Sequence, residues 1–422
     1  MSQLTTQPGA PLRGELRVPG DKSISHRALL FNGIAGGVAR VEGLLESLDV
    51  QATAGCLRRM GVQIEGGLIS GEGLREPDGP LDCGNSGTSM RLLCGVLAAQ
   101  PFFAVLDGDR HLRRRPMKRV TLPLGRMGAR FDGRNQGDLA PLAVRGGPLH
   151  SLDMASPIAS AQVKSAMLLA AVLGGEGTLR FSEPHRSRDH SERMLRAMGA
   201  VILEEEDGTL VVEGRQTLHA RDVVVPGDIS SAAFFLVAAS ITPGSELLLR
   251  NVGLNPTRSG VLDALRAMGA DITAVEEREA SGEPVADLLV RHAALRGTRI
   301  EGALIPRLID EVPVLAVAAA FAEGETVVAD AKELRVKESD RIAATVAGLR
   351  ALGVDADERP DGLVVQGGRP SQGRVHSLGD HRIAMAALVA GCAASGPVTA
   401  TDCANVATSF PSFMTLLRQA RA

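Results

Sequence analysis

The chain has 422 residues, which is more than one hydrophobic core usually serves, so two or more domains are expected. A net charge of −3 and the absence of Tyr and Trp argue against a nucleic-acid binder, despite one basic run at 113–119. Residues 1–20 lack a basic-then-apolar signal pattern, and the longest apolar stretches, about 10 residues, are half a membrane span. We expect a cytoplasmic protein with no nucleic-acid or membrane partner.

Taken in chain order, the sequence repeats one pattern six times. Each repeat opens with polar or charged residues, at 20–23, 85–88, 160–164, 227–231, 309–311 and 380–382. Apolar helices are expected next, at 28–34, 92–99, 165–173, 232–241, 312–322 and 383–392.

A strand, an amphipathic helix and a hairpin complete each repeat. The second helices close at Met60-Gly61, Met127-Gly128, Met198-Gly199, Met268-Gly269 and Leu352-Gly353. Their separation exceeds the ~20 to 50 residues of a solenoid repeat. The sixth copy stops in its second helix, at 413–421. We therefore predict an α/β protein whose six units divide into two groups of three.

The polar openings indicate the kind of ligand. A helix N-terminus presents unpaired N–H groups and partial positive charge, so six of them aimed at one place would hold several anionic groups. The pattern suggests an enzyme for phosphorylated or carboxylated small molecules.

Each opening also has an ordinary structural interpretation. These are a capping serine among solvated cations at 22–27, a capped turn at 85–91, solvated charged faces at 113–119 and 334–341, and N-caps at 310–311 and 380–382. Recurrence favours function, because six independent caps would not all need Lys, Gln, Arg, His or a carboxylate beside the capping residue.

Cofactors and metals find no support in the sequence. The five cysteines lack Cys-x-x-Cys spacing and nearby His ligands, so we expect reduced, mostly buried thiols and no metal site. The Gly-rich stretches contain neither the P-loop pattern nor Gly-x-Gly-x-x-Gly after a strand.

Together these motifs resemble the EPSP synthase (3-phosphoshikimate 1-carboxyvinyltransferase) family of enolpyruvyl transferases. The resemblance rests on Gly20-Asp21-Lys22-Ser23-Ile24-Ser25-His26-Arg27, Gly84-Asn85-Ser86-Gly87-Thr88, Arg115-Pro116, Ser160-Ala161-Gln162, 335–341 and Asp380-His381-Arg382. It implies a two-domain, inverse α/β barrel-like fold of six βαβαββ repeats, three per globular domain. One domain would span 21–227 and the other 1–20 plus 228–422, with the active site in the cleft between them.

The resemblance also implies a reaction. The enolpyruvyl group of phosphoenolpyruvate would pass to the 5-hydroxyl of shikimate 3-phosphate, giving 5-enolpyruvylshikimate 3-phosphate and phosphate in the shikimate pathway to chorismate and the aromatic amino acids. No cofactor is implied, and we expect a monomer with these two small-molecule substrates.

Site residues carry over from the resemblance one by one. Shikimate 3-phosphate would be held by Ser23, Arg27, Ser160, Gln162 and Arg188, with Lys337 and the backbone of Ala161 assisting. Phosphoenolpyruvate would be held by Gly87, Arg115, Arg341 and Arg382, with Asn85 shaping the turn. Three residues would be catalytic: Lys22 would touch both substrates, Asp310 would be the base for the 5-hydroxyl, and Glu338 would handle the methylene proton.

Two departures and two alternatives accompany this assignment. Thr408 stands where many members of the family carry Lys. Ala161 stands where Ser is frequent, which resembles the subgroup that includes members tolerant of the inhibitor glyphosate. Gly87, in contrast, leaves space for glyphosate. The sister UDP-N-acetylglucosamine enolpyruvyl transferase typically has Lys-Asn at Lys22-Ser23 and a loop Cys near Arg115. A non-catalytic metabolite-binding homologue would lose residues such as Asp310, which is present.

Overall fold

The computed structural model describes residues 3–421, which form two compact units. Unit 1 takes the chain up to residue 21, 226–279 and 283 onward, and unit 2 takes 22–225 and 280–282. These boundaries lie close to those expected after residues 20 and 227, but 280–282 was expected with 228–422. The turn belongs to unit 2 because Ser281 Oγ accepts a hydrogen bond from the Val224 amide at 2.9 Å.

Unit 2 contains three four-stranded sheets with one topology. Their orders are β14(Val223–Val224)-β3(Gly37–Glu42)-β5(Leu68–Gly71)-β4(Gln63–Glu65), then β6(Leu81–Asp82)-β7(Phe103–Asp107)-β9(Leu139–Arg145)-β8(Arg130–Gly133), and β10(Leu152–Ala155)-β11(Thr178–Ser182)-β13(Leu210–Glu213)-β12(Leu203–Glu204). The first pair in each order is parallel and the next two pairs are antiparallel. A parallel pair requires a crossover, and in the second and third sheets this crossover is one helix, which gives the βαβ units β6-α3-β7 and β10-α6-β11.

Unit 1 also contains three sheets. Their orders are β2(Arg13–Leu16)-β15(Glu246–Gly253)-β17(Glu283–Arg291)-β16(Asp271–Ala280), then β18(Arg299–Ile300)-β19(Glu325–Val328)-β21(Gly362–Gln366)-β20(Ala356–Arg359), and β22(Gly373–His376)-β23(Val398–Thr401)-β1(Gln3–Thr6). The third sheet needs β1 because the sixth copy ends in a helix before its hairpin. The predicted six-repeat α/β fold is confirmed, and within residues 3–421 the six sheets stay separate and close no barrel.

Two short strands pair away from their neighbours in sequence. β2 precedes the first helix of unit 2 but pairs in parallel with β15 of unit 1. β14 precedes the first long helix of the 226–279 segment but pairs in parallel with β3 of unit 2. The chain therefore completes the first repeat of each unit with a strand from a distant part of the sequence.

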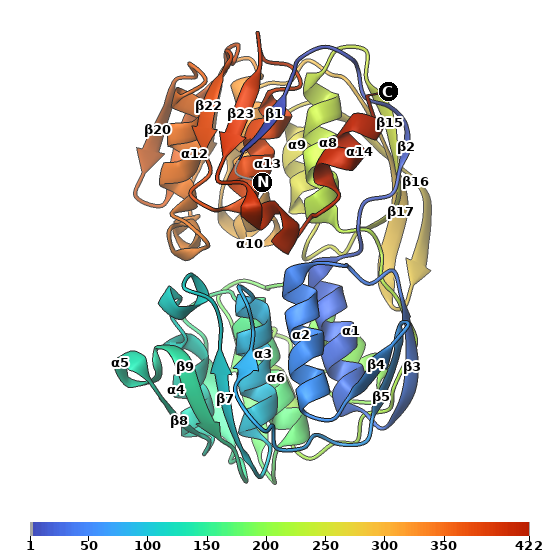
Figure 1. Ribbon diagram of the computed structural model, residues 1–422, viewed down its shortest axis with the longest axis vertical. Helices are drawn as coiled ribbons and strands as arrows, with labels where there is room; N and C mark the ends of the chain where they lie inside the picture. The colour runs from blue at the N-terminus through green and yellow to red at the C-terminus, as the bar shows by residue number, and fades with distance from the viewer. Residues whose placement is uncertain (1–2, 422) are drawn as a thin grey trace. The chain divides into compact units, whose positions relative to one another are not determined.

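Each unit buries three apolar helices. They are α1(Lys22–Ile34), α3(Gly87–Ala98) and α6(Ala161–Leu173) in unit 2, and α8(Ile229–Ile241), α11(Val312–Ala320) and α13(His381–Ala390) in unit 1. Every residue of α8 and α11 is buried, as expected of helices that are apolar on all sides. Figure 1 shows α1, α3 and α6 beside one another, with the strands of unit 2 outside them.

Outer helices follow the inner ones. They are α2(Leu48–Arg59), α4(Lys118–Arg126), α7(His190–Ala197), α9(Gly260–Ala267), α12(Arg341–Arg350) and α14(Phe413–Gln419). Short turns complete the chain: α5(Arg134–Gly137), α10(Ile305–Leu308), η1(Leu112–Arg114), η2(Gly302–Leu304), η3(Ile309–Glu311), η4(Lys332–Val336) and η5(Ala404–Thr408). The predicted glycine closures are confirmed, for example at Gly61 and Gly199, whose φ angles of 95° and 102° suit glycine.

Candidate active site

The polar openings of the six repeats lie at helix starts, as predicted. α3, α6, α8 and α13 are capped by Ser86, Ser160, Asp228 and Asp380, each accepting a backbone N–H with its side chain. α1 begins at Lys22, and Asp310 lies in η3 directly before α11. In both units, therefore, chemistry-bearing side chains stand beside helix N-termini, where backbone amides favour anions.

In unit 2, two guanidinium groups lie over the start of α3. Arg115 Nη2 donates to Asn85 Oδ1 at 2.8 Å, and Arg91 Nη1 donates to Gln162 Oε1 at 2.6 Å. A Cβ placed on Gly87 would be 2.9 Å from Arg91 Nη1 and 3.1 Å from Arg115 Nη1. The missing side chain at position 87 thus gives both cations access to the helix start, and Arg91 joins the expected set.

Lys22 and Arg27 project from α1 into different surroundings. Lys22 Nζ forms an ion pair with Asp49 of α2, and its side chain keeps 22% exposure. Arg27 is 2% exposed and donates to the Ser23 carbonyl at 3.0 Å, Ser165 Oγ at 2.7 Å and Ser191 Oγ at 2.8 Å. These contacts join α1 to α6 and α7, so Arg27 stabilises the packing of these helices in addition to its expected role in holding shikimate 3-phosphate.

The remaining expected residues of unit 2 border the same helices. Ser160, Ala161 and Gln162 are half-buried at the start of α6, and Gln162 Nε2 donates to Thr88 Oγ1 at 2.9 Å. Arg188 is half-buried in the connection between β11 and α7. Thr88 and Gln162 therefore join the starts of α3 and α6 directly.

In unit 1, Arg341 gathers three carboxylates. It donates to Asp380 Oδ2 at 2.9 Å, Glu338 Oε2 at 2.6 Å and Asp310 Oδ1 at 3.2 Å, and its side chain is 1% exposed. Lys337 Nζ lies 3.3 Å from Asp310 Oδ1. The two expected acid–base groups, Asp310 and Glu338, are thus held by one buried arginine.

Electrostatics agree with this arrangement. Burial alone would lower the pKa of Arg341, but the carboxylates of Asp380, Glu338 and Asp310 outweigh burial and raise it. For Asp380, burial opposes ionisation, yet the Arg341 charge dominates and lowers the pKa of this carboxyl. Arg341 is therefore a fixed cation whose first contacts are protein carboxylates.

A second buried network supports Arg382. Arg382 Nη1 donates to the Asp310 carbonyl at 2.9 Å and to Glu311 Oε1 at 3.3 Å. Glu311 is 1% exposed, accepts from Arg258 Nη1 at 2.8 Å and hydrogen-bonds to Ser230. Burial opposes the charge of Arg258, but Glu311 and nearby carboxylates raise its pKa.

Asp228 lies in this network, and its pKa is shifted in the opposite direction from that of Asp380. Burial and the neighbouring Asp21 carboxylate raise the pKa of Asp228 to about 6, although Arg258 and Arg382 act in the opposite direction. The two aspartates cap equivalent helices, α8 and α13, yet their pKa values move in opposite directions. Arg341 hydrogen-bonds to Asp380 at 2.9 Å, whereas Arg258 Nη2 lies 3.8 Å from Asp228 Oδ1 and the Asp21 carboxylate adds a negative charge beside Asp228.

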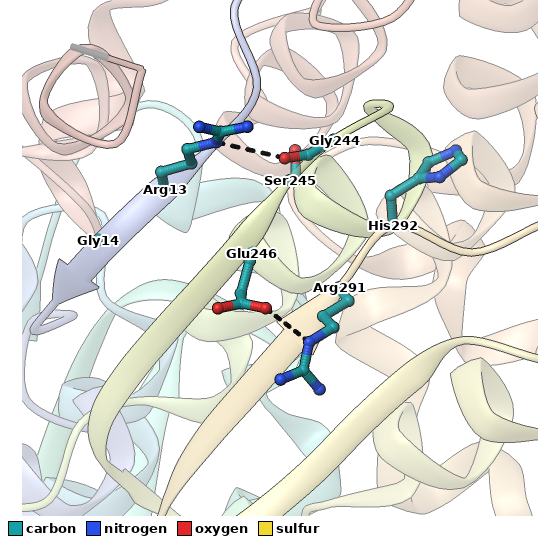
Figure 2. Close-up of a pocket in the computed structure, with 7 residues that line it drawn as sticks. All are labelled: Arg13, Gly14, Gly244, Ser245, Glu246, Arg291 and His292. Carbon is teal, nitrogen blue, oxygen red and sulfur yellow. Dashed lines mark hydrogen bonds and ion pairs between the residues drawn. The ribbon is translucent and has the colours of Figure 1, made fainter.

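The cysteines and one surface pocket lie outside these clusters. All five cysteines are buried and free, as predicted. Within residues 3–421 no group of three His, Cys, Asp or Glu side chains is placed to hold a metal ion, and no helix there is long and apolar enough to cross a membrane. Figure 2 shows a surface pocket of unit 1 that contains none of the expected site residues; Arg13 and Arg291 line it, and Arg291 Nε binds Glu246 at 2.7 Å.

Comparison with known proteins decides the family. A sequence model described as EPSP synthase (3-phosphoshikimate 1-carboxyvinyltransferase) matches residues 6–417. The chain belongs to the EPSP synthase family. A 3-phosphoshikimate 1-carboxyvinyltransferase of Geobacter sulfurreducens is 57% identical over 425 residues, covering 99% of both chains, and one of Geobacter metallireducens is 54% identical, covering 100% of both.

Solved structures agree with the sequence relatives. An EPSP synthase structure from Acinetobacter baumannii superposes with a TM-score of 0.89 at 44% identity, covering 100% of this chain and 98% of that one. The predicted membership in this transferase family is confirmed over the UDP-N-acetylglucosamine enolpyruvyl transferase alternative.

Several residues of this EPSP synthase family member were missed as site residues by sequence reasoning. They are Arg91, Asp228, Arg258, Glu311 and Asp380. Arg91, Asp228, Glu311 and Asp380 lie within about one turn of an expected apolar helix, and a charged residue at such a position is the signal that could have identified them. Arg258 lies just before the outer helix α9 and carries no such signal, so only its burial and its contact with Glu311 reveal it.

Proposed function

We propose that this chain transfers the enolpyruvyl group of phosphoenolpyruvate to the 5-hydroxyl of shikimate 3-phosphate and releases phosphate. The observation that carries the proposal is the match of nearly the whole chain to relatives named 3-phosphoshikimate 1-carboxyvinyltransferase. The presence of Lys22, Asp310 and Glu338 supports activity over a binding role alone.

The residues of unit 2 suit a phosphorylated acceptor. We assign shikimate 3-phosphate to Ser23, Arg27, Ser160, Gln162 and Arg188, with the amide of Ala161 and with Lys337. Ser160 and Ala161 stand at the N-terminus of a 13-residue helix, a position where backbone N–H groups bind phosphate well. Arg27 contributes mainly by fixing Ser23, whose carbonyl it binds at 3.0 Å.

Phosphoenolpyruvate needs cations for both its carboxylate and its phosphate. We assign these to Lys22, Arg115, Arg341 and Arg382, with Asn85 and Gly87 shaping the turn. Arg115 is half-buried and oriented by Asn85, which suits a bidentate contact with an anion. Arg341 contributes the electrostatic attraction of its positive charge to phosphoenolpyruvate while it holds Asp310 and Glu338 in place.

The proposed chemistry is an addition followed by an elimination. Glu338 gives a proton to the methylene carbon of phosphoenolpyruvate, and Asp310 takes the proton of the 5-hydroxyl as its oxygen bonds to C2. The bond from C2 to the phosphate oxygen of the tetrahedral intermediate then breaks, and phosphate leaves with the proton that Asp310 had taken. The new methyl group returns a proton to Glu338, which restores the vinyl group and both carboxyl groups. Lys22 and the arginines stabilise the negative charge on the departing phosphate.

Two further properties are part of the proposal. We assign the protein to the cytoplasm and expect it to work as a monomer on small-molecule substrates. A molar mass near 44.1 kDa in light scattering would support the monomer, and twice that value would contradict it.

An acceptor comparison tests the function. The full chain is mixed with phosphoenolpyruvate and either shikimate 3-phosphate, shikimate or UDP-N-acetylglucosamine, and phosphate release is followed. Of the three acceptors, we expect only shikimate 3-phosphate to give rapid phosphate release. Shikimate should give little, because the 3-phosphate supplies the charge that the helix starts bind. Equal rates with and without any acceptor would contradict the proposal.

A further inference from the structure

Lys164 of α6 is a buried cation that the proposed reaction does not use. Its side chain is 2% exposed, and Nζ lies 2.9 Å from Glu183 Oε1, 2.8 Å from Glu192 Oε1 and 3.0 Å from the Ser187 carbonyl. An ammonium group has three donors, and here each has an acceptor. Burial of a charge is costly unless it is paired in this way.

The three acceptors come from one connection of the chain. Glu183 and Ser187 lie between β11 and α7, and Glu192 is in the first turn of α7. Glu183 Oε1 also accepts the Ser187 amide at 2.8 Å and Ser187 Oγ at 2.9 Å. Lys164 therefore sits at the centre of a folded loop that leads directly into Arg188.

On the other side, Lys164 belongs to the start of α6. It is four residues from Ser160, so the two share one face of the helix. The next residue makes a parallel connection, since Ser165 Oγ lies 2.6 Å from Ser191 Oγ. Two consecutive side chains of α6, those of Lys164 and Ser165, thus join the start of this helix to the loop before α7 and to the first turn of α7.

We propose that Lys164 is a positioning residue for the acceptor substrate. By clamping the Ser187 carbonyl, it sets where Arg188 stands relative to Ser160 and Gln162, the other groups assigned to shikimate 3-phosphate. This inference rests on the proposed function of the site. Lys164 itself contacts no reacting atom in this account.

The experiment compares binding of shikimate 3-phosphate, by titration calorimetry, in wild type, Lys164→Met, Arg188→Ala and the double variant. Methionine keeps most of the side-chain volume and removes the three hydrogen bonds. We expect Lys164→Met to raise the Kd about tenfold, the equivalent of one misplaced charged contact. In the Arg188→Ala background the same substitution should change the Kd less than about twofold, because its effect passes through Arg188.

Asn32→Ala provides a matched control. Asn32 is fully buried in the same unit and clamps the backbone of Arg221 through two hydrogen bonds of 2.9 and 3.1 Å. It lies near the end of α1, away from the helix starts. This variant should lose stability while its Kd for shikimate 3-phosphate stays within about twofold of wild type.

Three outcomes separate the possibilities. Equal Kd values for wild type and Lys164→Met, or equal effects with and without Arg188, would overturn the positioning role and leave the proposed function standing. No binding by wild type would overturn both. If Lys164→Met does not fold, Lys164→Met/Glu192→Gln removes one buried carboxylate together with the ammonium and is measured against the same expectations.

Discussion

A methyl group at Gly87 tests the arrangement at the start of α3 most sharply. The backbone there is helical and has no positive φ, so alanine imposes no conformational strain. Its Cβ, however, would lie 2.9 Å from Arg91 Nη1 and 3.1 Å from Arg115 Nη1, against about 3.4 Å for ordinary contact. Both guanidinium groups must therefore shift by a few tenths of an ångström.

The expected cost follows from what those groups hold. Arg115 donates to Asn85 and Arg91 donates to Gln162, so a shift weakens charged hydrogen bonds and moves the cation assigned to phosphoenolpyruvate. Overpacking of this kind costs about 1 to 3 kcal/mol, which corresponds to a roughly 5- to 150-fold rise in the KM for phosphoenolpyruvate. The inhibition constant of glyphosate should rise further, because the longer ligand also meets the methyl group itself.

The assay is steady-state phosphate release at varied phosphoenolpyruvate, with and without glyphosate. Gly55→Ala in α2 is the control, since a Cβ there meets nothing within 4 Å, and its kinetic constants should equal those of wild type. The reasoning is refuted if Gly87→Ala leaves the KM for phosphoenolpyruvate unchanged. An unchanged ratio of the glyphosate and phosphoenolpyruvate constants would refute the steric part alone.

Three further predictions concern stability, pH and turnover. Gly95→Ala places a Cβ 2.2 Å from the Ala166 carbonyl oxygen, where α3 meets α6, and should lower the free energy of unfolding by about 3 kcal/mol in urea titrations; a loss below about 1 kcal/mol would contradict the close approach. Asp228, with its raised pKa, stabilises the fold below pH ~4 and loses this contribution as the pH rises through about 6, so the free energy of unfolding of wild type should fall relative to Asp228→Asn by up to ~3 kcal/mol. Asp380 has a lowered pKa, so the free energy of unfolding of wild type should rise relative to Asp380→Asn as the pH rises from about 2 to 5. Curves of unfolding free energy against pH that stay parallel for wild type and both variants would contradict both assignments. Asp310→Ala should lower turnover about 10²-fold or more while Lys22→Ala also raises substrate dissociation constants, and near-normal turnover in the Asp310 variant would remove its role as base.

Much of the fold could be predicted from local sequence patterns. Apolar helices with polar openings and glycine closures are local signals, and they identified the six repeats and the residues at each helix start. The helix expected over 312–322 ends at Ala320 in the structure, a small difference typical of helix ends. Family motifs then added the reaction and its residues.

Long-range pairing could not be predicted in the same way. The strands β1, β2 and β14 are only two to four residues long, and each pairs with a strand more than 150 residues away. The buried ion pairs of Lys164 with Glu192 and of Arg258 with Glu311 also depend on which helices become neighbours. A charged residue in a sequence looks the same whether it faces solvent or a buried partner, so burial had to come from the structure.

The fate of the bridging oxygen shows directly whether this protein transfers an enolpyruvyl group. Phosphoenolpyruvate labelled with ¹⁸O between C2 and phosphorus is incubated with shikimate 3-phosphate and the full chain, and the products are analysed by mass spectrometry. Enolpyruvyl transfer breaks the C2–O bond, so we expect the label in inorganic phosphate and an acceptor heavier by one enolpyruvyl group. Label retained in pyruvate, with an unmodified acceptor, would show phosphate-ester hydrolysis and would exclude enolpyruvyl transfer.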